Sequence, residues 1–213
     1  MSKLFLDIPA ADSNFTNSRA AILPVPYEAT VTYGNGTKKG PQAILNASQK
    51  LELYDQELDK EPYKIGVATL PMLKGNNRNI QQKIESEISI LLDKGKFPIM
   101  LGGEHTVSVG AVKAAKNKYS DLSVLQLDAH ADLRDSYNGA KYSHACVMRR
   151  ILDICPAVQA GVRSISQEEM DFARSIGQAK KIFWADQINI EEILAGLSSH
   201  VYITIDIDVF DPA

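Results

Sequence analysis

The sequence predicts an α/β fold with three αβα layers around a mainly parallel central sheet. Apolar runs rich in β-branched residues alternate with helical patterns from residue 20 almost to the end of the chain. These runs show little polar alternation, which is typical of parallel strands whose two faces are both covered. No internal repeat or long linker interrupts the pattern, so we expect a single domain over residues 1–213.

The order of the expected elements follows from these runs. Strands are expected at Ala20–Pro24, Lys64–Ala68, Phe97–Leu101, Leu122–Leu127, Ala157–Gly161, Lys181–Trp184 and Val201–Ile205. Helices are expected at Pro41–Leu51, Asn79–Asp93, Thr106–Lys116, His144–Leu152, Gln167–Ile176 and Ile190–Leu197. In open parallel sheets, ligands bind beyond the carboxyl ends of the strands, so functional residues are expected at that edge.

Composition and charge exclude several classes of protein. The net charge is -3 and the basic residues are scattered, so we expect no nucleic acid partner. No apolar run approaches the ~20 residues that a membrane span needs, and the first residues do not resemble a secretory signal. We therefore expect a cytoplasmic protein without a membrane partner. In that compartment, Cys146 and Cys155 are expected to be free, partly buried thiols.

Polar residues with metal-binding atoms follow three of the expected strands. Each set begins where an apolar run stops. In an extended chain every second side chain points to the same side, so Asp128, His130 and Asp132 could project together, as could Asp206 and Asp208. The candidate ligands are His105, Asp128, His130, Asp132, Asp206 and Asp208. Gly102 and Gly103 would permit the sharp turn that directs His105 to the same edge.

The residue types in this set indicate two divalent cations. Four carboxylates placed together repel one another, and two such cations would balance their charge. Four oxygen donors and two imidazoles without a thiolate favour Mn²⁺, although Fe²⁺, Co²⁺, Ni²⁺ or Zn²⁺ would also fit. Two such ions acidify a shared water enough to provide hydroxide near neutral pH, which predicts a hydrolase acting on a small molecule.

Three further polar residues need interpretation, and the first two have two interpretations each. His144 opens an expected helix and is either a capping or surface histidine or a proton shuttle at the mouth of the site. Glu104 either holds His105 or is a solvated carboxylate at a helix start. His200 lies before a strand without polar neighbours of interest, so we interpret it as structural.

The motifs together resemble the ureohydrolases, the family of arginases and agmatinases. They are Gly-Gly-Glu-His-Thr at 102–106, Asp-Ala-His-Ala-Asp at 128–132 and Asp-Ile-Asp-Val-Phe-Asp-Pro-Ala at 206–213. Val-Pro-Tyr-Glu-Ala-Thr at 25–30 and Gly-Thr-Lys-Lys-Gly-Pro-Gln-Ala-Ile at 36–44 extend the similarity over essentially the whole chain. The resemblance implies an arginase-like fold and a homo-oligomer, either a trimer or a hexamer.

The resemblance also implies roles for particular residues. The family's six manganese ligands correspond to the six candidates named above, so two Mn²⁺ ions are the expected cofactors. His144 matches the family's mobile histidine, which implies a catalytic role as a proton shuttle. The implied reaction is attack by hydroxide on a guanidinium carbon, followed by collapse to urea and an amine, with the metal pair stabilising the charge of the intermediate.

The substrate implied by the resemblance is a small guanidino compound. The loop at 133–143 and the Tyr-Ser-His-Ala stretch at 142–145 look more like agmatinases than arginases. We therefore expect agmatine to be hydrolysed to putrescine and urea in polyamine biosynthesis. A different guanidino acid, such as guanidinobutyrate or arginine, stays open as the substrate.

The end of the sequence bears on activity. The chain ends at Ala213, inside a motif that continues in the family, whereas family members carry a carboxylate near the carboxyl end that pairs with the guanidinium. We expect either a fragment or a chain that lacks this part, and a truncated, inactive metal-binding chain is the non-enzymatic alternative. Metal-dependent phosphoesterases and deacetylases are disfavoured because their additional histidines are missing.

Overall fold

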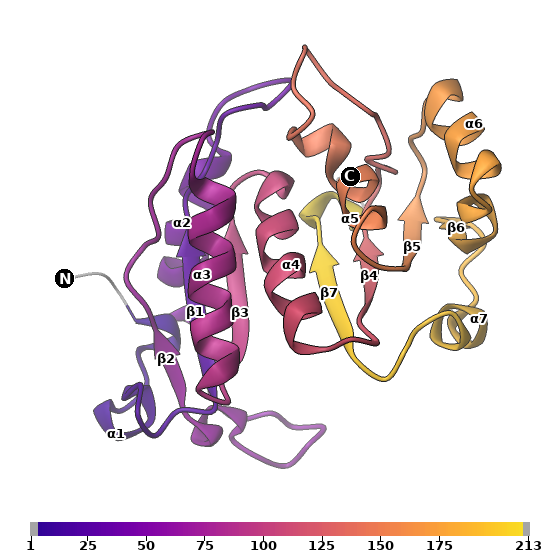
Figure 1. The fold of residues 1–213 in the computed structure, drawn as a ribbon. Coiled ribbons are helices and arrows are strands. Elements are labelled where there is room, and N and C mark those ends of the chain that lie inside the picture. Colours follow the sequence, from indigo (N-terminus) through magenta and orange to yellow (C-terminus); the bar gives the residue numbers. More distant parts are fainter. Residues whose placement is uncertain (1–3, 211–213) are drawn as a thin grey trace. The chain divides into compact units, whose positions relative to one another are not determined.

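The computed structural model describes residues 4–210, which divide between Val107 and Ser108 into two compact units. Each unit has its own sheet, and all pairings between the named strands are parallel (Figure 1). The predicted parallel α/β class is therefore confirmed. The prediction of a single domain over residues 1–213 stays a prediction.

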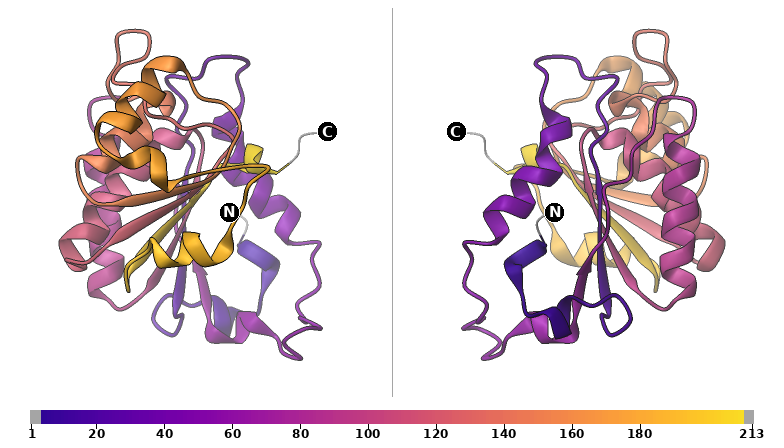
Figure 2. Two further views of the ribbon diagram at one scale, coloured as in Figure 1. Left: turned by 90° about the vertical axis from the view of Figure 1, so that its right-hand side faces the viewer. Right: turned by 90° about the vertical axis from the view of Figure 1, so that its left-hand side faces the viewer.

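The first unit contains a three-stranded sheet in the order β2-β1-β3. Its strands are β1 (Ala20–Val25), β2 (Val67–Thr69) and β3 (Phe97–Gly102). Every residue of β1 is buried, because helices α2 (Gly40–Ser48) and α3 (Ile80–Asp93) lie on opposite faces of this sheet (Figure 2). The apolar residues of β1 are thus continuous because both faces of the strand are covered, as expected.

The second unit contains a four-stranded sheet in the order β6-β5-β4-β7. Its strands are β4 (Ser123–Leu127), β5 (Ala157–Val162), β6 (Ile182–Trp184) and β7 (Val201–Ile205). On one face, Leu125 and Leu127 pack with Ile193 of helix α7 (Ile190–Ala195). On the other, Ser108 of helix α4 (Ser108–Lys118) hydrogen-bonds Thr204 of β7 at 3.1 Å.

The remaining helices are short. They are α1 (Ala10–Ser13), α5 (Val147–Leu152) and α6 (Gln167–Ser175), with the 3-10 helices η1 (Phe5–Asp7), η2 (Thr37–Lys39), η3 (Pro62–Ile65), η4 (His105–Val107), η5 (His144–Cys146), η6 (Gln178–Lys181) and η7 (Ile207–Val209). Over residues 4–210, the chain has no helix with the length and apolar character needed to cross a membrane.

Several predicted boundaries were wrong by two or three residues. The helix expected from His144, for example, begins at Val147 after η5. The second strand was expected from Lys64, but Lys64 and Ile65 belong to η3, and β2 begins only at Val67. Gly66 separates the two elements with φ +81°, and a Cβ there would lie 2.6 Å from the Cα of Ser18. The first helix was expected to reach Leu51 but ends at Ser48.

Candidate metal centre

Asp128 follows the last residue of β4 at the carboxyl edge of the second unit's sheet. Its side chain is 1% exposed, so its oxygens depend on protein donors. Gln126 Nε2 donates to Oδ2 at 2.7 Å, and the backbone N–H of His130 donates to Oδ1 at 2.7 Å. These bonds hold a buried carboxylate in one orientation at the strand end.

His130 joins Asp128 to Asp208, which lies in η7 just after β7. Its Nδ1 is 3.0 Å from Asp208 Oδ2 and 3.7 Å from Asp128 Oδ1. Hydrogen bonds to Asp128 and Asp208 raise the pKa of the imidazole to about 10, although partial burial opposes this. A ligand atom from each of the three residues lies within 4.8 Å of the others, which is a spacing suited to one metal ion.

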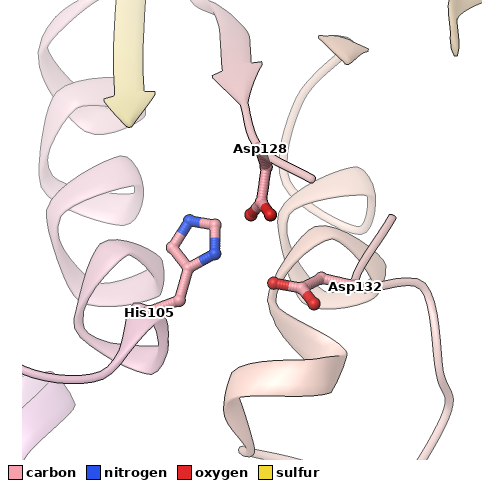
Figure 3. Close-up of side chains that lie close together, drawn as sticks. All are labelled: His105, Asp128 and Asp132. Atoms are coloured by element: carbon pink, nitrogen blue, oxygen red, sulfur yellow. The ribbon is translucent and has the colours of Figure 1, made fainter. Parts of the chain in front are cut away.

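Asp132 lies beside the same carboxylate. An oxygen of Asp132 lies within 4.8 Å of one of Asp128, and Figure 3 shows the two carboxylates facing each other. Asp132 has φ +52°, a left-handed conformation that Asp tolerates better than most residues. Its carbonyl oxygen accepts hydrogen bonds from Met148 and Arg149 at the start of α5, which fixes this turn.

Asp206 has a different local role from the one that strand alternation predicts. Its N–H donates to the carbonyl of Leu127, which extends the β4–β7 pairing by one bond. The chain then enters η7, and the Asp206 side chain caps it by accepting from the N–H of Asp208 at 3.4 Å. The premise that residues 206–208 are extended was therefore wrong, although Asp208 still reaches His130 through the turn.

His105 belongs to the first unit, where it begins η4 after β3. Gly103 is required here for a reason other than the predicted turn: a Cβ at this position would lie 2.0 Å from the carbonyl oxygen of Tyr27. Glu104 is buried and accepts hydrogen bonds from both N–H groups of Ala29 and Thr30 and from the hydroxyls of Thr30 and Thr106. It is thus no solvated carboxylate, because it anchors the loop after β1.

His144 begins η5 in the second unit and is half-buried. Its ring meets Tyr137 edge-on at 5.5 Å, and its Nδ1 is 3.4 Å from the hydroxyl of Ser143. Tyr137 and Ala140 exchange two backbone hydrogen bonds around a tight turn in which Asn138 and Gly139 both have positive φ. The loop before His144 is therefore a short hairpin with a defined shape.

A pocket of about 220 Å³ borders the candidate ligands in the second unit. Its lining residues are His130, Asp132, Arg134, Ala145, Ser164, Ile165, Ser166 and Glu169. Glu169 closes one side, where its carboxylate accepts from the N–H groups of Leu133 and Ser166 and from the Ser166 hydroxyl. A small molecule in this pocket would lie against two of the predicted metal ligands.

The residues gathered in the second unit fit a divalent cation. Carboxylates accept but do not donate, and here two of them, Asp128 and Asp208, lie beside one imidazole whose pKa they raise. A cation at this place would neutralise the same excess negative charge. Oxygen donors with imidazole suit Mn²⁺ and other divalent ions of the first transition row, and the choice of Mn²⁺ among them stays a prediction.

Sequence reasoning missed three residues that build this edge. Gln126 donates to Asp128, and Gln159 donates to the carbonyl of Ala131 at 2.8 Å. Gly161 has φ +91°, and a Cβ there would lie 2.7 Å from Val209 and 3.3 Å from the carbonyl oxygen of Asp128. A polar glutamine inside each of two apolar runs, Val-Leu-Gln-Leu and Val-Gln-Ala-Gly, was the signal that could have found the two glutamines.

Comparison with known proteins agrees with this geometry. The model of the arginase family matches residues 18–213. The chain belongs to the arginase family. It is 36% identical over 226 residues to the N(1)-aminopropylagmatine ureohydrolase of Synechocystis sp., covering 99% of this chain and 73% of that protein. It is 38% identical over 208 residues to the agmatinase of Bacillus anthracis, covering 94% of this chain and 71% of the relative.

The solved structures confirm the fold of this arginase-family chain. The agmatine ureohydrolase of Thermoplasma volcanium superimposes with a TM-score of 0.85 at 32% identity, over 100% of this chain and 73% of that one. The predicted family and arginase-like fold are therefore confirmed. The prediction of a ureohydrolase-type enzyme is confirmed at the level of the family, whose members are binuclear metal enzymes.

Proposed function

We propose that this chain hydrolyses agmatine to putrescine and urea with two Mn²⁺ ions. The observation that carries the proposal is the cluster of Asp128, His130 and Asp208 at the carboxyl ends of β4 and β7, with Asp132 beside it, in a chain of the arginase family. The proposed ligands are His105, Asp128, His130, Asp132, Asp206 and Asp208. The inclusion of His105 and Asp206 rests on the sequence motifs.

The proposed chemistry divides between the ions and the chain. Bound ions would act as Lewis acids and would lower the pKa of a water molecule enough to provide hydroxide near neutral pH. The Asp128 and Asp132 carboxylates would balance the charge of the ions, and the backbone and Gln126 bonds of Asp128 would keep its oxygens in place. We propose that the imidazole of His144 donates a proton to the departing amine.

The 220 Å³ pocket beside His130 and Asp132 is the proposed place for the substrate. It is large enough for a short alkyl chain that carries a guanidinium group toward the ligands. N(1)-aminopropylagmatine is the second candidate substrate, because a relative with 36% identity is named for it. Guanidinobutyrate and arginine stay open as substrates, and a metal-binding chain without turnover is the non-enzymatic candidate.

Urea release tests the proposal. The chain loaded with Mn²⁺ should release urea from agmatine, and parallel assays with N(1)-aminopropylagmatine, guanidinobutyrate and arginine would rank the four kcat/KM values. Release of putrescine in equal amount would confirm which bond breaks. Two bound ions without urea from any of these compounds would contradict the enzymatic function and leave the metal-binding chain as the better interpretation.

The ligand assignment has its own test. Asp132→Ala should lower the number of Mn²⁺ ions bound per chain, because it removes one carboxylate of the facing pair. Asp171→Ala is the matched control, since Asp171 is an exposed carboxylate of α6 that pairs with Arg174. Equal manganese content in the wild type and a folded Asp132→Ala variant would rule out Asp132 as a ligand.

Assembly and location complete the proposal. We infer a cytoplasmic enzyme of polyamine biosynthesis that assembles as a trimer or hexamer, as the family resemblance implies. Light scattering of the purified chain would measure the assembly, and a monomer at micromolar concentration would contradict it.

A further inference from the structure

Three buried glutamine side chains lead through the second unit to Asp128. Gln126 and Gln159 are 0% exposed, and Gln178 is 5% exposed. Gln126 of β4 and Gln159 of β5 are register partners, so their side chains lie next to each other on the same face of the sheet. Gln178 begins η6, and its side chain reaches Gln159. Buried amides are costly unless their polar atoms are paired.

The three amides are paired in one direction. Gln178 Nε2 donates to Gln159 Oε1 at 3.3 Å, and Gln159 Nε2 donates to Gln126 Oε1 at 2.6 Å. Gln126 Nε2 then donates to Asp128 Oδ2 at 2.7 Å. Each oxygen in the series accepts and each nitrogen donates to the next member. The series ends on a carboxylate oxygen, which accepts hydrogen bonds.

Each amide nitrogen also donates to a backbone carbonyl. Gln178 Nε2 reaches the carbonyl of Ala157 at 3.2 Å, within the sheet. Gln159 Nε2 reaches the carbonyl of Ala131 at 2.8 Å, and Gln126 Nε2 reaches that of His130 at 3.3 Å. Two of these carbonyls belong to the segment 128–132, which also carries three proposed ligands. The amides therefore hold this segment at two backbone points and one side chain.

Packing alone does not explain three glutamines in this place. A methionine fills nearly the same volume without any polar atom to satisfy, and most of the other buried residues of the sheet are apolar. What glutamine adds is a set of directed donors aimed at the ligand segment. We propose that Gln126 and Gln159 are positioning residues that hold Asp128 and the 128–132 segment in the geometry that binds metal. This inference rests on the metal site of the proposed function.

Methionine variants at the three positions test the inference. Gln126→Met removes the donors to Asp128 and His130, and Gln159→Met removes the donors to Gln126 and Ala131. Gln178→Met is the matched control, because Gln178 donates to Gln159 and Ala157 but to no atom of the 128–132 segment. The Kd for Mn²⁺ would be measured by electron paramagnetic resonance of the free ion on chains whose folding is checked by circular dichroism. The Tm of each metal-free variant would be measured in parallel.

The expected result is a graded loss of metal affinity. Gln126→Met should raise the Kd by about 10- to 100-fold, Gln159→Met should raise it less, and Gln178→Met should leave it nearly unchanged. If Gln126→Met does not fold, a raised Kd in Gln159→Met supports the inference on its own. A lower Tm in all three variants with a wild-type Kd would indicate a packing role and overturn it. Failure of the wild-type chain to bind Mn²⁺ would instead overturn the proposed function, and this inference with it.

Discussion

Gly161 shows how closely the backbone segments of the candidate site approach each other. It interrupts the pairing of β5 with β6 and has φ +91°, which L side chains rarely adopt. The space where its Cβ would lie is already bordered by Val209 of η7 and the carbonyl oxygen of Asp128. A glycine at this position therefore allows the elements that carry Asp128 and Asp208 to come together.

Replacement of Gly161 should be more costly than its backbone conformation alone explains. We expect Gly161→Ala to lower the free energy of unfolding by about 1–3 kcal/mol, because strain and a close contact act together. Gly177→Ala is the control, since Gly177 has φ +77° but no atom within 4 Å of the added Cβ. Urea unfolding would measure the free energy of unfolding of both variants. An equal decrease in the two would show that the contact with Val209 has no effect.

The two cysteines should be unreactive. Both are free and buried, and burial raises the pKa of Cys146 to about 11. Only on the order of 0.1% of this thiol would be ionised at pH 8, and the thiolate is the reactive form. We expect iodoacetamide to label neither cysteine in the folded chain and both in urea. Rapid labelling of Cys146 without denaturant would contradict this prediction.

At the scale of elements, the loop after β1 is held by two carboxylates. The buried carboxylate of Glu104 accepts from the N–H groups of Ala29 and Thr30, and the carboxylate of Glu28 accepts from the N–H groups of Gly36 and Lys38 later in the chain. These bonds connect β1 to η2 and α2 without regular secondary structure. Backbone groups of a loop need such partners when water cannot reach them.

The Glu28 bonds predict a loss of stability in acid. Hydrogen bonds to its carboxylate lower the pKa of Glu28 from 4.5 to about 2. The backbone N–H of Gly36 contributes most, and Lys38 and the Thr37 hydroxyl also contribute. Because the pKa is lower in the folded state, the stabilisation is present above pH 4.5 and is lost as the pH falls from 4.5 toward 2. Between pH 5 and pH 3, the free energy of unfolding should therefore fall less in Glu28→Gln than in the wild type.

Urea unfolding at several pH values would measure this difference. Glu52→Gln is the control, because Glu52 is an exposed carboxylate on a different segment. Parallel acid dependence in the wild type and in Glu28→Gln would show that Glu28 does not contribute to it.

For the whole molecule, metal should stabilise the folded state. The cluster of Asp128, His130 and Asp208 is assembled from residues that an unfolded chain separates, so an ion should bind the folded chain far more tightly. At a free Mn²⁺ concentration 100 times its Kd, the free energy of unfolding should rise by about 2.7 kcal/mol per site. Calorimetry with Mn²⁺ and after chelation would measure it, and an unchanged Tm would contradict metal binding by the folded state.

Most regular elements were predictable because their local pattern and their tertiary environment agree. The strand Val201–Ile205 was predicted with its observed ends, and α3 begins one residue after its expected start. The strand start expected at Lys64 was wrong, because Gly66 passes close to the backbone of Ser18, a contact that no local pattern reveals, and β2 begins only at Val67. Similarly, η7 follows β7 directly, although the D-x-D motif there suggested an extended chain.

The sequence by itself determined the family, the parallel α/β class and the identity of the candidate ligands, because these depend on residue types in order along the chain. Only the tertiary structure decided that Asp208 meets His130 through a turn and that Asp128 is held by Gln126. It also decided that the buried amide series reaches Gln178. The contacts of Asp208 with His130 and of Gln178 with Gln159 join residues far apart in sequence, so they follow from strand register and burial, which no single segment specifies. Gln126 and Asp128 are only two positions apart, but the fold decides that their side chains meet.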